Sequence, residues 1–492
     1  MENKQDSLSM RISKRSFLIA FVILFVLMMT VGVLTQVVPT GSYQRVTVDG
    51  RETIVENSFA FTDAQRLPVY RWFTAPIELL GSSDGAVVIV IIFFLLAVIM
   101  AFSLLEKSDI MSLLIFKAVR RFGGKKYVLM AVLVFFFMLM GAVLGTFEEN
   151  IALVPLMIAL AYCLGWDSLV GLGMSMLASC FGFTAAITNP FSIAITQEIA
   201  NLPLYSGSGY RILIFAVFYG LLFLFLYRYA RKIEKNPEKS MVYGEDSALR
   251  AKYGNGDALE RMFSEKTPEA YAQLKKAAMV FGVFIGLIAV TFAAASLISA
   301  LSDLMLPLMG LLLLAGALVA SGVAGVSGRQ KLNILGASAA GIAPGILVIL
   351  MAMSVKFIIS NGGIMDTILY YTANAIMNTS PYAAILLVYA LILLLELFVG
   401  SSSAKAFLVM PLIAPLADLV GITRQASVLA FSFGDGFSNM LYPTNPVLLI
   451  CLGLTVVTFP KWMKWTYKLQ LAALAIACGF LLIGVAVQYG PF

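Results

Sequence analysis

Hydrophobic positions form long uninterrupted runs along most of this chain. Residues 16–37 and 86–105 are two such runs, each close to the length at which a helix crosses about 30 Å of hydrocarbon. The sequence lacks the alternation of apolar and polar positions, over about ten residues, that is typical of membrane barrels. The pattern therefore predicts an all-α polytopic membrane protein.

Basic residues collect between these runs rather than inside them. By the positive-inside rule they mark cytoplasmic loops, which predicts a cytoplasmic N-terminus in a bacterial cytoplasmic (inner) membrane. The formal net charge of +7 is explained in this way and calls for no nucleic acid partner. The five segments assigned to the cytoplasm hold 26 of the 34 lysines and arginines: 1–15, 106–126, 228–276, 326–331 and 458–468.

Two polar tips each join a pair of short apolar stretches, one pair in each half of the chain. The stretches at 127–165 are joined by "GTFEEN" and those at 381–419 by "GSSSAK". We expect each pair to form a re-entrant hairpin, whose non-helical tip must be buried in protein rather than in lipid. The alternative is that both stretches are complete spans, with the tip at an external surface.

A Thr-Asn-Pro triplet follows each tip at nearly the same interval. The separation is 40 residues from Asn150 to Pro190 and 41 residues from Lys405 to Pro446. Because a proline inside an apolar helix removes one backbone hydrogen bond, each triplet predicts a broken helix, with an ordinary proline kink as the alternative. The broken helices are expected at 168–200 and 425–457.

This similarity extends over most of both halves and predicts two repeats. A charged linker separates them, and one connecting span reverses the orientation of the second repeat, so that the two hairpins open to opposite sides of the membrane. The expected organisation is a first repeat at 1–231, a cytoplasmic linker at 232–273, a connecting span at 274–299 and an inverted second repeat at 300–492.

Acidic side chains inside apolar segments are costly and are usually functional or paired. Glu148 and Glu149 at the first tip, and Asp435 in the second broken helix, are therefore the leading ionisable candidates. Each could instead form a fixed ion pair with Lys405. For Glu396, packing against a polar partner and a role in transport are equally good interpretations.

The second tip and the two breaks supply the other candidate ligands. Hydroxyls, amides and one cation at the second tip suit a carboxylate, although a solvated serine-rich turn would have the same composition. Carbonyl ends suit cations, so a coupling sodium ion would bind near Asn189 and Asn445; protons are the alternative, and no cofactor is expected. The remaining candidate binding residues are Asn150, Thr188, Pro190, Ser401, Ser402, Ser403, Lys405, Asn439, Thr444 and Pro446.

Three segments carry a resemblance to a known family. At "GTFEENIALVPLMIALAYCLGWDSLVG", "TNPFSIAITQEIANLPLYSGSGYR" and "SSSAKAFLVMPLIAPLADLVGITRQASVLAFSFGDGFSNMLYPTNP" the chain resembles the YfcC-like carriers. These are grouped with the anaerobic four-carbon dicarboxylate carrier (DcuC) family, inside the wider ion-transporter superfamily. The resemblance implies an elevator-type secondary transporter with two re-entrant hairpins, whose relatives are described both as dicarboxylate carriers and as basic amino-acid antiporters. The positions that match the family's motifs are Glu149, Asn150, Asn189, Ser401, Ser402, Ser403, Lys405 and Asn445.

We expect coupled transport or exchange of a small organic ion that bears a carboxylate, either a four-carbon dicarboxylate or an amino acid. The acids outnumber Lys405, which suits a substrate's ammonium or guanidinium group, a sodium ion or a proton, and these alternatives stay open. A basic amino-acid antiporter is the closest alternative function, with a channel or a membrane-embedded enzyme more distant. The chain contains no histidine, so an enzyme would lack the commonest catalytic base. The expected partners are the lipid bilayer, the substrate and a second copy of the chain in a homodimer.

Overall fold

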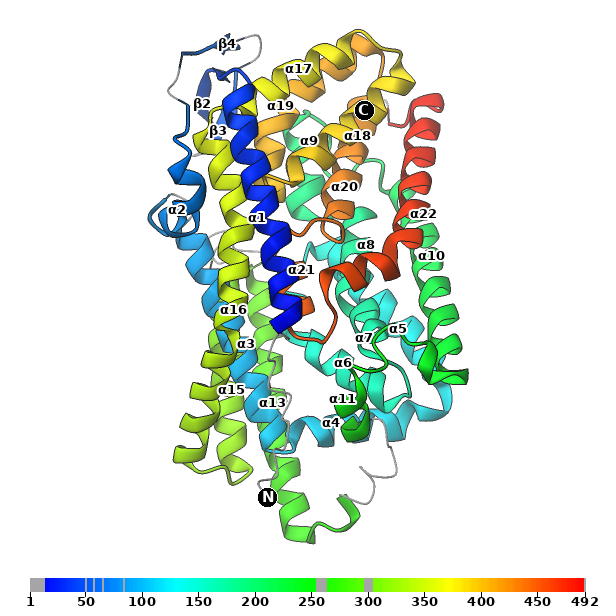
Figure 1. Ribbon diagram of the computed structural model, residues 1–492. Coiled ribbons are helices and arrows are strands. Elements are labelled where there is room, and N and C mark those ends of the chain that lie inside the picture. The colour runs from blue at the N-terminus through cyan, green and yellow to red at the C-terminus, as the bar shows by residue number, and fades with distance from the viewer. Residues whose placement is uncertain are drawn as a thin grey trace.

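The computed structural model describes residues 14–48, 51–55, 58–63, 66–82, 85–253, 263–295 and 304–490, and these residues are almost entirely helical (Figure 1). Within them, seven helices are long and apolar enough to cross a membrane, or up to eight if a bent pair counts as one span. The prediction of an all-α membrane protein is confirmed at this level. The seven are Gly85–Lys107, Lys126–Leu144, Ser208–Lys235, Pro268–Ile288, Leu306–Val323, Ser402–Val420 and Phe459–Ala486, and the bent pair lies within residues 328–361.

The first helices and strands frame one side and one end of the molecule. Helix α1 leads to two short antiparallel strand pairs, and these strands lie at the end of the molecule opposite to α4 (Figure 1). The bounds are α1 (Lys14–Val37), β1 (Gly41–Ser42), β2 (Arg45–Val48), β3 (Arg51–Ile54), β4 (Ala60–Phe61), α2 (Tyr70–Glu78), α3 (Gly85–Lys107) and α4 (Ile110–Phe122).

The first tip and the first break follow. A π-helical turn at Met140–Leu144 ends on Gly145, whose φ of 70° is a left-handed conformation that glycine adopts at little cost. The chain then continues through the first tip, and the following helix is interrupted at residues 185–189. The bounds are α5 (Lys126–Leu139), η4 (Glu149–Leu153), α6 (Val154–Cys163), α7 (Ser168–Leu172), η5 (Gly173–Leu177), α8 (Ala178–Thr184), η6 (Pro190–Ala194), α9 (Ile195–Ile199) and α10 (Ser208–Lys235).

The segment predicted as a cytoplasmic linker contains ordered structure. Short helices η7 (Pro237–Lys239) and α11 (Ser247–Tyr253) pack on α10 and α6 respectively. Helix α13 (Pro268–Ala295) begins inside the predicted linker because the Thr267 hydroxyl accepts a hydrogen bond from the Ala270 N–H, 3.3 Å away, as a helix cap. Residues 254–262, and 296–299 of the predicted connecting span, lie outside the described residues.

The second half contains the second tip and the second break. Helices α18 and α19 are joined by the tip, and residues 439–445 separate α20 from α21. The bounds are α15 (Met305–Val323), α16 (Gly328–Asn361), α17 (Met365–Met377), α18 (Pro381–Glu396), α19 (Ser402–Val420), α20 (Arg424–Ser438), α21 (Pro446–Gly453) and α22 (Phe459–Ala486).

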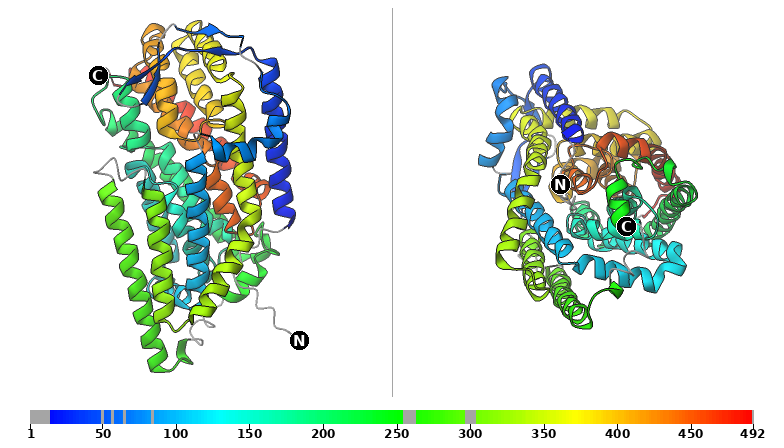
Figure 2. Two further views of the ribbon diagram at one scale, coloured as in Figure 1. Left: turned by 90° about the vertical axis from the view of Figure 1, so that its left-hand side faces the viewer. Right: turned by 60° about the horizontal axis from the view of Figure 1, so that its bottom comes forward.

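Long helices α3, α13, α15 and α16 pack side by side along one side of the molecule, as both views in Figure 2 show. The two interrupted helices lie elsewhere, and their N-terminal parts α8 and α20 pack directly on one another. The approach is close because a Cβ built on Gly436 would lie 2.0 Å from the backbone nitrogen of Thr184, so only glycine fits there. The two breaks are therefore brought into one region.

The two predicted hairpins are unequal in the lengths of their arms. Lys126–Leu144 and Ser402–Val420 are each long enough to cross a membrane, whereas Glu149–Cys163 and Pro381–Glu396 are shorter apolar helices. Length alone therefore does not separate a re-entrant hairpin from a pair of spans. The re-entrant geometry and the inverted repeat stay predictions.

Candidate functional site

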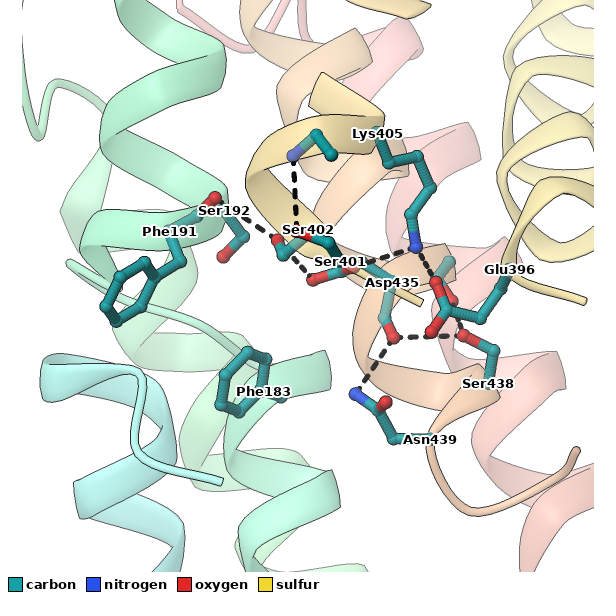
Figure 3. Close-up of polar contacts among 12 residues, drawn as sticks. Phe183, Phe191, Ser192, Glu396, Ser401, Ser402, Lys405, Asp435, Ser438 and Asn439 are labelled. Atoms are coloured by element: carbon teal, nitrogen blue, oxygen red, sulfur yellow. Dashed lines mark hydrogen bonds and ion pairs between the residues drawn. The ribbon is translucent and has the colours of Figure 1, made fainter. Parts of the chain in front are cut away.

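A buried cation lies at the second tip. Helix α18 ends at Glu396, the chain turns through residues 397–401, and α19 begins with Ser401 as its N-cap. Lys405 in the first turn of α19 has 0% of its side chain exposed. Its Nζ forms one ion pair with Oε2 of Glu396 and lies 3.0 Å from Oδ1 of Asp435 (Figure 3).

Asp435 connects the second tip to the interrupted helix of the same half. This residue of α20 is 2% exposed, and its Oδ2 accepts a hydrogen bond of 2.8 Å from the Ser402 hydroxyl. The same hydroxyl oxygen lies 3.2 Å from the carbonyl oxygen of Phe191, at the start of the second part of the first interrupted helix. Ser402 therefore contacts one residue of each interrupted helix (Figure 3).

The charge of this cluster is unbalanced. Glu396, Lys405 and Asp435 together carry two carboxylates and one ammonium group. Burying ions is costly, and removal of one partner from a buried pair typically costs about 3–5 kcal/mol because a charge is left uncompensated. The geometry holds Lys405 firmly and leaves the cluster with the capacity for one further positive charge.

The first tip is organised differently. The Asn150 amide is 4% exposed and donates hydrogen bonds to the Thr146 carbonyl at 3.0 Å and to the Ser179 hydroxyl at 2.8 Å. Glu149 is half-buried, and its Oε2 accepts the backbone N–H of Phe147 at 3.0 Å. The amide therefore ties this tip to the interrupted helix of its own half.

Glu148 at the first tip is exposed, unlike the acids of the second tip. It lies close enough to Asp435 for the two carboxylates to repel each other, and Glu149 is repelled by Glu148 in the same way. The acids of the first tip thus add to the negative charge around Asp435.

Both asparagines of the Thr-Asn-Pro triplets cap the second part of an interrupted helix. Asn189 Oδ1 accepts the backbone N–H groups of Phe191 at 2.9 Å and of Ser192 at 3.3 Å, and Asn445 Oδ1 accepts that of Leu448 at 3.1 Å. Capping satisfies amides that the helix itself cannot pair. Pro190 and Pro446 occupy the next position, where the missing N–H costs no hydrogen bond.

The asparagine side-chain amides complete the two breaks. Asn189 donates to the Gly141 carbonyl at 3.2 Å, whereas Asn445 donates to Asn439 Oδ1 at 2.6 Å, and Asn439 donates to the Asp435 carbonyl at 3.1 Å. The second break is therefore linked to Asp435 through Asn439, but the first break is anchored to the helix before the first tip.

The predicted hydroxyls have different surroundings. Thr188 donates to the Val143 carbonyl at 3.3 Å, while the Ser401 and Ser403 hydroxyl oxygens lie 3.4 Å apart at the second tip. Among the described residues, the buried hydroxyls of Thr444 and Ser192 have no hydrogen-bond partner. Ser192 was not predicted, and its only sequence signal is its position two residues after Pro190.

The structure brings Ser402, Lys405 and Asp435 into direct contact and shows the partner of Glu396. That acid is ion-paired with Lys405, an arrangement that is compatible with both interpretations of Glu396. In the sequence, Glu396 lies nine residues before Lys405, which could have suggested an ion pair between them. The sequence alone did not show that α18 ends at Glu396, which is what allows the chain to turn back and bring the two side chains together.

The structure has several helices of membrane-crossing length and two interrupted helices. A buried charged cluster lies beside the interruptions. Together these features are typical of a polytopic membrane transporter. Comparison with known proteins gives the family. Residues 17–486 match the family described as "DcuC: C4-dicarboxylate anaerobic carrier", and the chain belongs to it. The protein is therefore a transporter and not an enzyme.

Two relatives are similar over most of the chain. One is the "Putative basic amino acid antiporter YfcC" of Escherichia coli (strain K12), which is 31% identical over 376 residues, covering 74% of this chain and 71% of that protein. The other is an uncharacterized protein of Haemophilus influenzae (strain ATCC 51907 / DSM 11121 / KW20 / Rd), 24% identical and covering 95% of this chain and 97% of that protein.

Two solved transporter structures align along nearly the whole chain. The Alcanivorax borkumensis YdaH transporter is 17% identical with a TM-score of 0.40, and covers 96% of this chain and 97% of its own. Neisseria gonorrhoeae MtrF, from a study of antimetabolite efflux pumps, is 16% identical with a TM-score of 0.43, and covers 94% of both chains. Scores this low do not assign their fold to this protein.

Proposed function

We propose that this protein is a secondary transporter that exchanges basic amino acids across the bacterial cytoplasmic membrane, with its N-terminus in the cytoplasm. The observation that carries the proposal is the excess of carboxylate in the buried cluster. Glu396 and Asp435 share the single ammonium group of Lys405, and the exposed Glu148 adds negative potential at Asp435. A substrate's ammonium or guanidinium group would restore the charge balance.

A four-carbon dicarboxylate is the second candidate, because the family description names that substrate class. Such a substrate needs two cationic or amide-rich subsites to hold its two carboxylates. Lys405 is fully buried and already engaged by two acids, so it is poorly available for a substrate carboxylate. The name of the Escherichia coli relative also favours a basic amino acid.

The carboxylate of an amino acid has its own complementary surroundings in this proposal. The first turn of α19 at the second tip presents backbone amides and the hydroxyls of Ser401 and Ser403, and helix N-termini favour anions. The unpartnered hydroxyls of Ser192 and Thr444 are further hydrogen-bonding groups beside the breaks. The cationic side chain of the substrate would then extend toward Asp435 and Glu148.

For the transport cycle, we infer alternating access by two inverted repeats, each with a re-entrant hairpin, that move in an elevator-type mechanism. Support comes from Ser402, whose hydroxyl lies within hydrogen-bond distance of Asp435 in its own half and of the Phe191 carbonyl in the other half. A contact shared by both halves can transmit the presence of substrate from one repeat to the other. Exchange would be coupled to a second substrate molecule, a sodium ion or a proton.

Counterflow in proteoliposomes tests the proposed substrate class. Vesicles loaded with unlabelled arginine or lysine should accumulate labelled arginine from outside, and an external four-carbon dicarboxylate in excess should not compete. Counterflow of a labelled dicarboxylate that basic amino acids do not inhibit would replace the proposal with the second candidate. Imposed sodium and pH gradients, applied separately, then identify the coupling ion.

A further inference from the structure

The two carboxylates that hold Lys405 differ in their surroundings. Asp435 also accepts the Ser402 hydroxyl of the second tip and lies near the exposed carboxylate of Glu148 at the first tip. Glu396 is the last residue of α18, is 4% exposed and is ion-paired with Lys405. Asp435 is therefore the carboxylate of the pair that also contacts the second tip through Ser402, whereas Glu396 has its ion pair with Lys405 (Figure 3). We expect a substrate cation to meet Asp435 first.

We propose that Lys405 is a tethered substitute for the substrate's cationic group, and that Glu396 is the residue that retains Lys405 when substrate takes Asp435. In the empty carrier Lys405 partly neutralises Asp435. When substrate binds, the substrate's ammonium or guanidinium group displaces Lys405 from Asp435 while the ion pair with Glu396 persists. This inference rests on the proposed function, because it needs a substrate that carries a positive charge.

The consequence concerns the empty carrier. Without Lys405 the cluster would hold two buried carboxylates and no cation, a state that is strongly disfavoured in a low-dielectric environment. With Lys405 in place the charge is reduced to that of one carboxylate, so the empty protein can change conformation and return across the membrane. Lys405 thus permits net flux, whereas exchange of one substrate for another needs only the substrate's own cation.

Three variants separate the parts of this proposal. Lys405→Met removes the ammonium group and keeps an apolar chain of similar length, and Lys405→Arg retains the charge. Glu396→Gln leaves Lys405 with Asp435 as its charged partner in the cluster. Each variant is reconstituted in proteoliposomes, and three quantities are measured with labelled arginine: the affinity, the rate of exchange against internal arginine, and net uptake into empty vesicles.

The variants should change affinity in opposite directions. Lys405→Met should bind arginine at least tenfold more tightly, because the internal competitor is gone, and should lose at least nine-tenths of net uptake while it retains exchange. Glu396→Gln should bind arginine several-fold more weakly and keep net uptake, because Lys405 then competes harder for Asp435. Lys405→Arg should keep both fluxes within a few-fold.

Changes of arginine affinity in opposite directions in the two variants support the proposal. If folded Lys405→Met and folded Glu396→Gln both bind arginine more weakly, the proposal is overturned, because that result identifies a purely structural ion pair. If Lys405→Met does not accumulate in the membrane, the double variant Lys405→Met/Glu396→Gln removes one charge of each sign. The empty cluster of that protein again carries the charge of one carboxylate, so net uptake and exchange should both be retained, and arginine should bind more tightly than to the wild type because Lys405 no longer competes. Weaker arginine binding in the folded double variant would overturn the proposal. If the wild-type protein neither binds nor exchanges arginine or lysine, the proposed function itself is wrong.

Discussion

The two tips lie at matching positions in their halves of the chain, yet they handle charge in opposite ways. At the first tip the buried group is a neutral amide, Asn150, and Glu148 is exposed. At the second tip the buried group is the Lys405 ammonium, enclosed by Glu396 and Asp435. The carboxylate of Glu148 at the first tip is exposed, while the second tip encloses an ammonium group between two buried carboxylates.

From this difference we predict a structural role for the first tip and a role in recognition for the second. The hydrogen bonds of Asn150 go to Thr146 and Ser179, so they tie the first tip to its own half. The contacts of Ser402 reach Asp435 and the Phe191 carbonyl, so they cross between the halves. The two tips thus lie at corresponding places in the two halves of the chain, but among their described contacts Ser402 of the second tip is the one that reaches both interrupted helices.

Asp435→Asn should have the largest effect on transport. The substitution removes the carboxylate that meets the proposed substrate cation, while Lys405 keeps its ion pair with Glu396. A hydrogen bond to a charged group contributes about 1.5–3 kcal/mol. We expect arginine exchange in proteoliposomes to fall by about a hundredfold. Asp418→Asn is the matched control, because Asp418 is half-exposed in its ion pair with Arg424 and such surface pairs contribute about 0–1 kcal/mol. Equal exchange rates in the two variants would show that Asp435 does not bind substrate.

Asn150→Ala tests the structural role of the first tip. The alanine leaves the Thr146 carbonyl and the Ser179 hydroxyl without their buried donor, which should lower the free energy of unfolding by about 1–3 kcal/mol. Thermal unfolding in detergent measures this loss. Arginine affinity, measured on the folded fraction, should change less than stability does. A variant of normal stability that no longer binds arginine would assign Asn150 to recognition and remove the contrast between the tips.

Glu148→Gln should reduce arginine affinity by less than about tenfold, because an exposed carboxylate acts on Asp435 and on substrate through water. The effect should shrink further as salt concentration rises, since salt screens exposed charges. Binding at low and high ionic strength measures it. A loss that is large and independent of salt would place Glu148 in direct contact with substrate, and the first tip would then be a recognition element too.

The sequence predicted the membrane class and the positions of the interruptions because both depend on local composition. Long apolar runs require helices in lipid, and a proline at 190 or 446 cannot continue a hydrogen-bonded helix. The partner of Lys405 could not be predicted in the same way. Whether Glu396 points to Lys405 depends on where α18 ends and how α19 turns back, which is a tertiary property of the folded tip.

Another buried carboxylate, Asp246, extends the comparison, because it lies in the linker and its described hydrogen-bond donors are neutral. Asp246 has 0% exposure and accepts hydrogen bonds from the Tyr162 hydroxyl at 2.5 Å and from the backbone N–H of Ser168 at 3.1 Å. Burial raises the pKa of Asp246 from its ordinary value of 3.8 to about 6, and repulsion from Asp167 adds to the increase, although these hydrogen bonds oppose it. At the second tip the Lys405 ammonium group offsets part of the carboxylate charge. The described hydrogen-bond donors to the Asp246 carboxylate are neutral groups of Tyr162 and Ser168.

The last prediction is a small pH dependence of linker docking. The pKa of Asp246 is higher when the linker is docked, so protonation of Asp246 favours the docked linker. This contribution to the docking free energy is fully present below about pH 4 and is lost as the pH rises through about 6. Between pH 5 and pH 7 the docking free energy should fall by about 1 kcal/mol. Hydrogen exchange of α11, corrected for the intrinsic effect of pH, should therefore be faster at pH 7. Asp246→Asn should reduce this dependence whatever its effect on absolute protection, and the part that remains is assigned to Asp167, which accepts the Ser240 hydroxyl of the linker and whose pKa is also raised by burial. Glu245→Gln, at a half-exposed ion pair with Lys461, should preserve the full dependence. If Asp246→Asn keeps the wild-type dependence, Asp246 does not titrate in this range and another group controls docking.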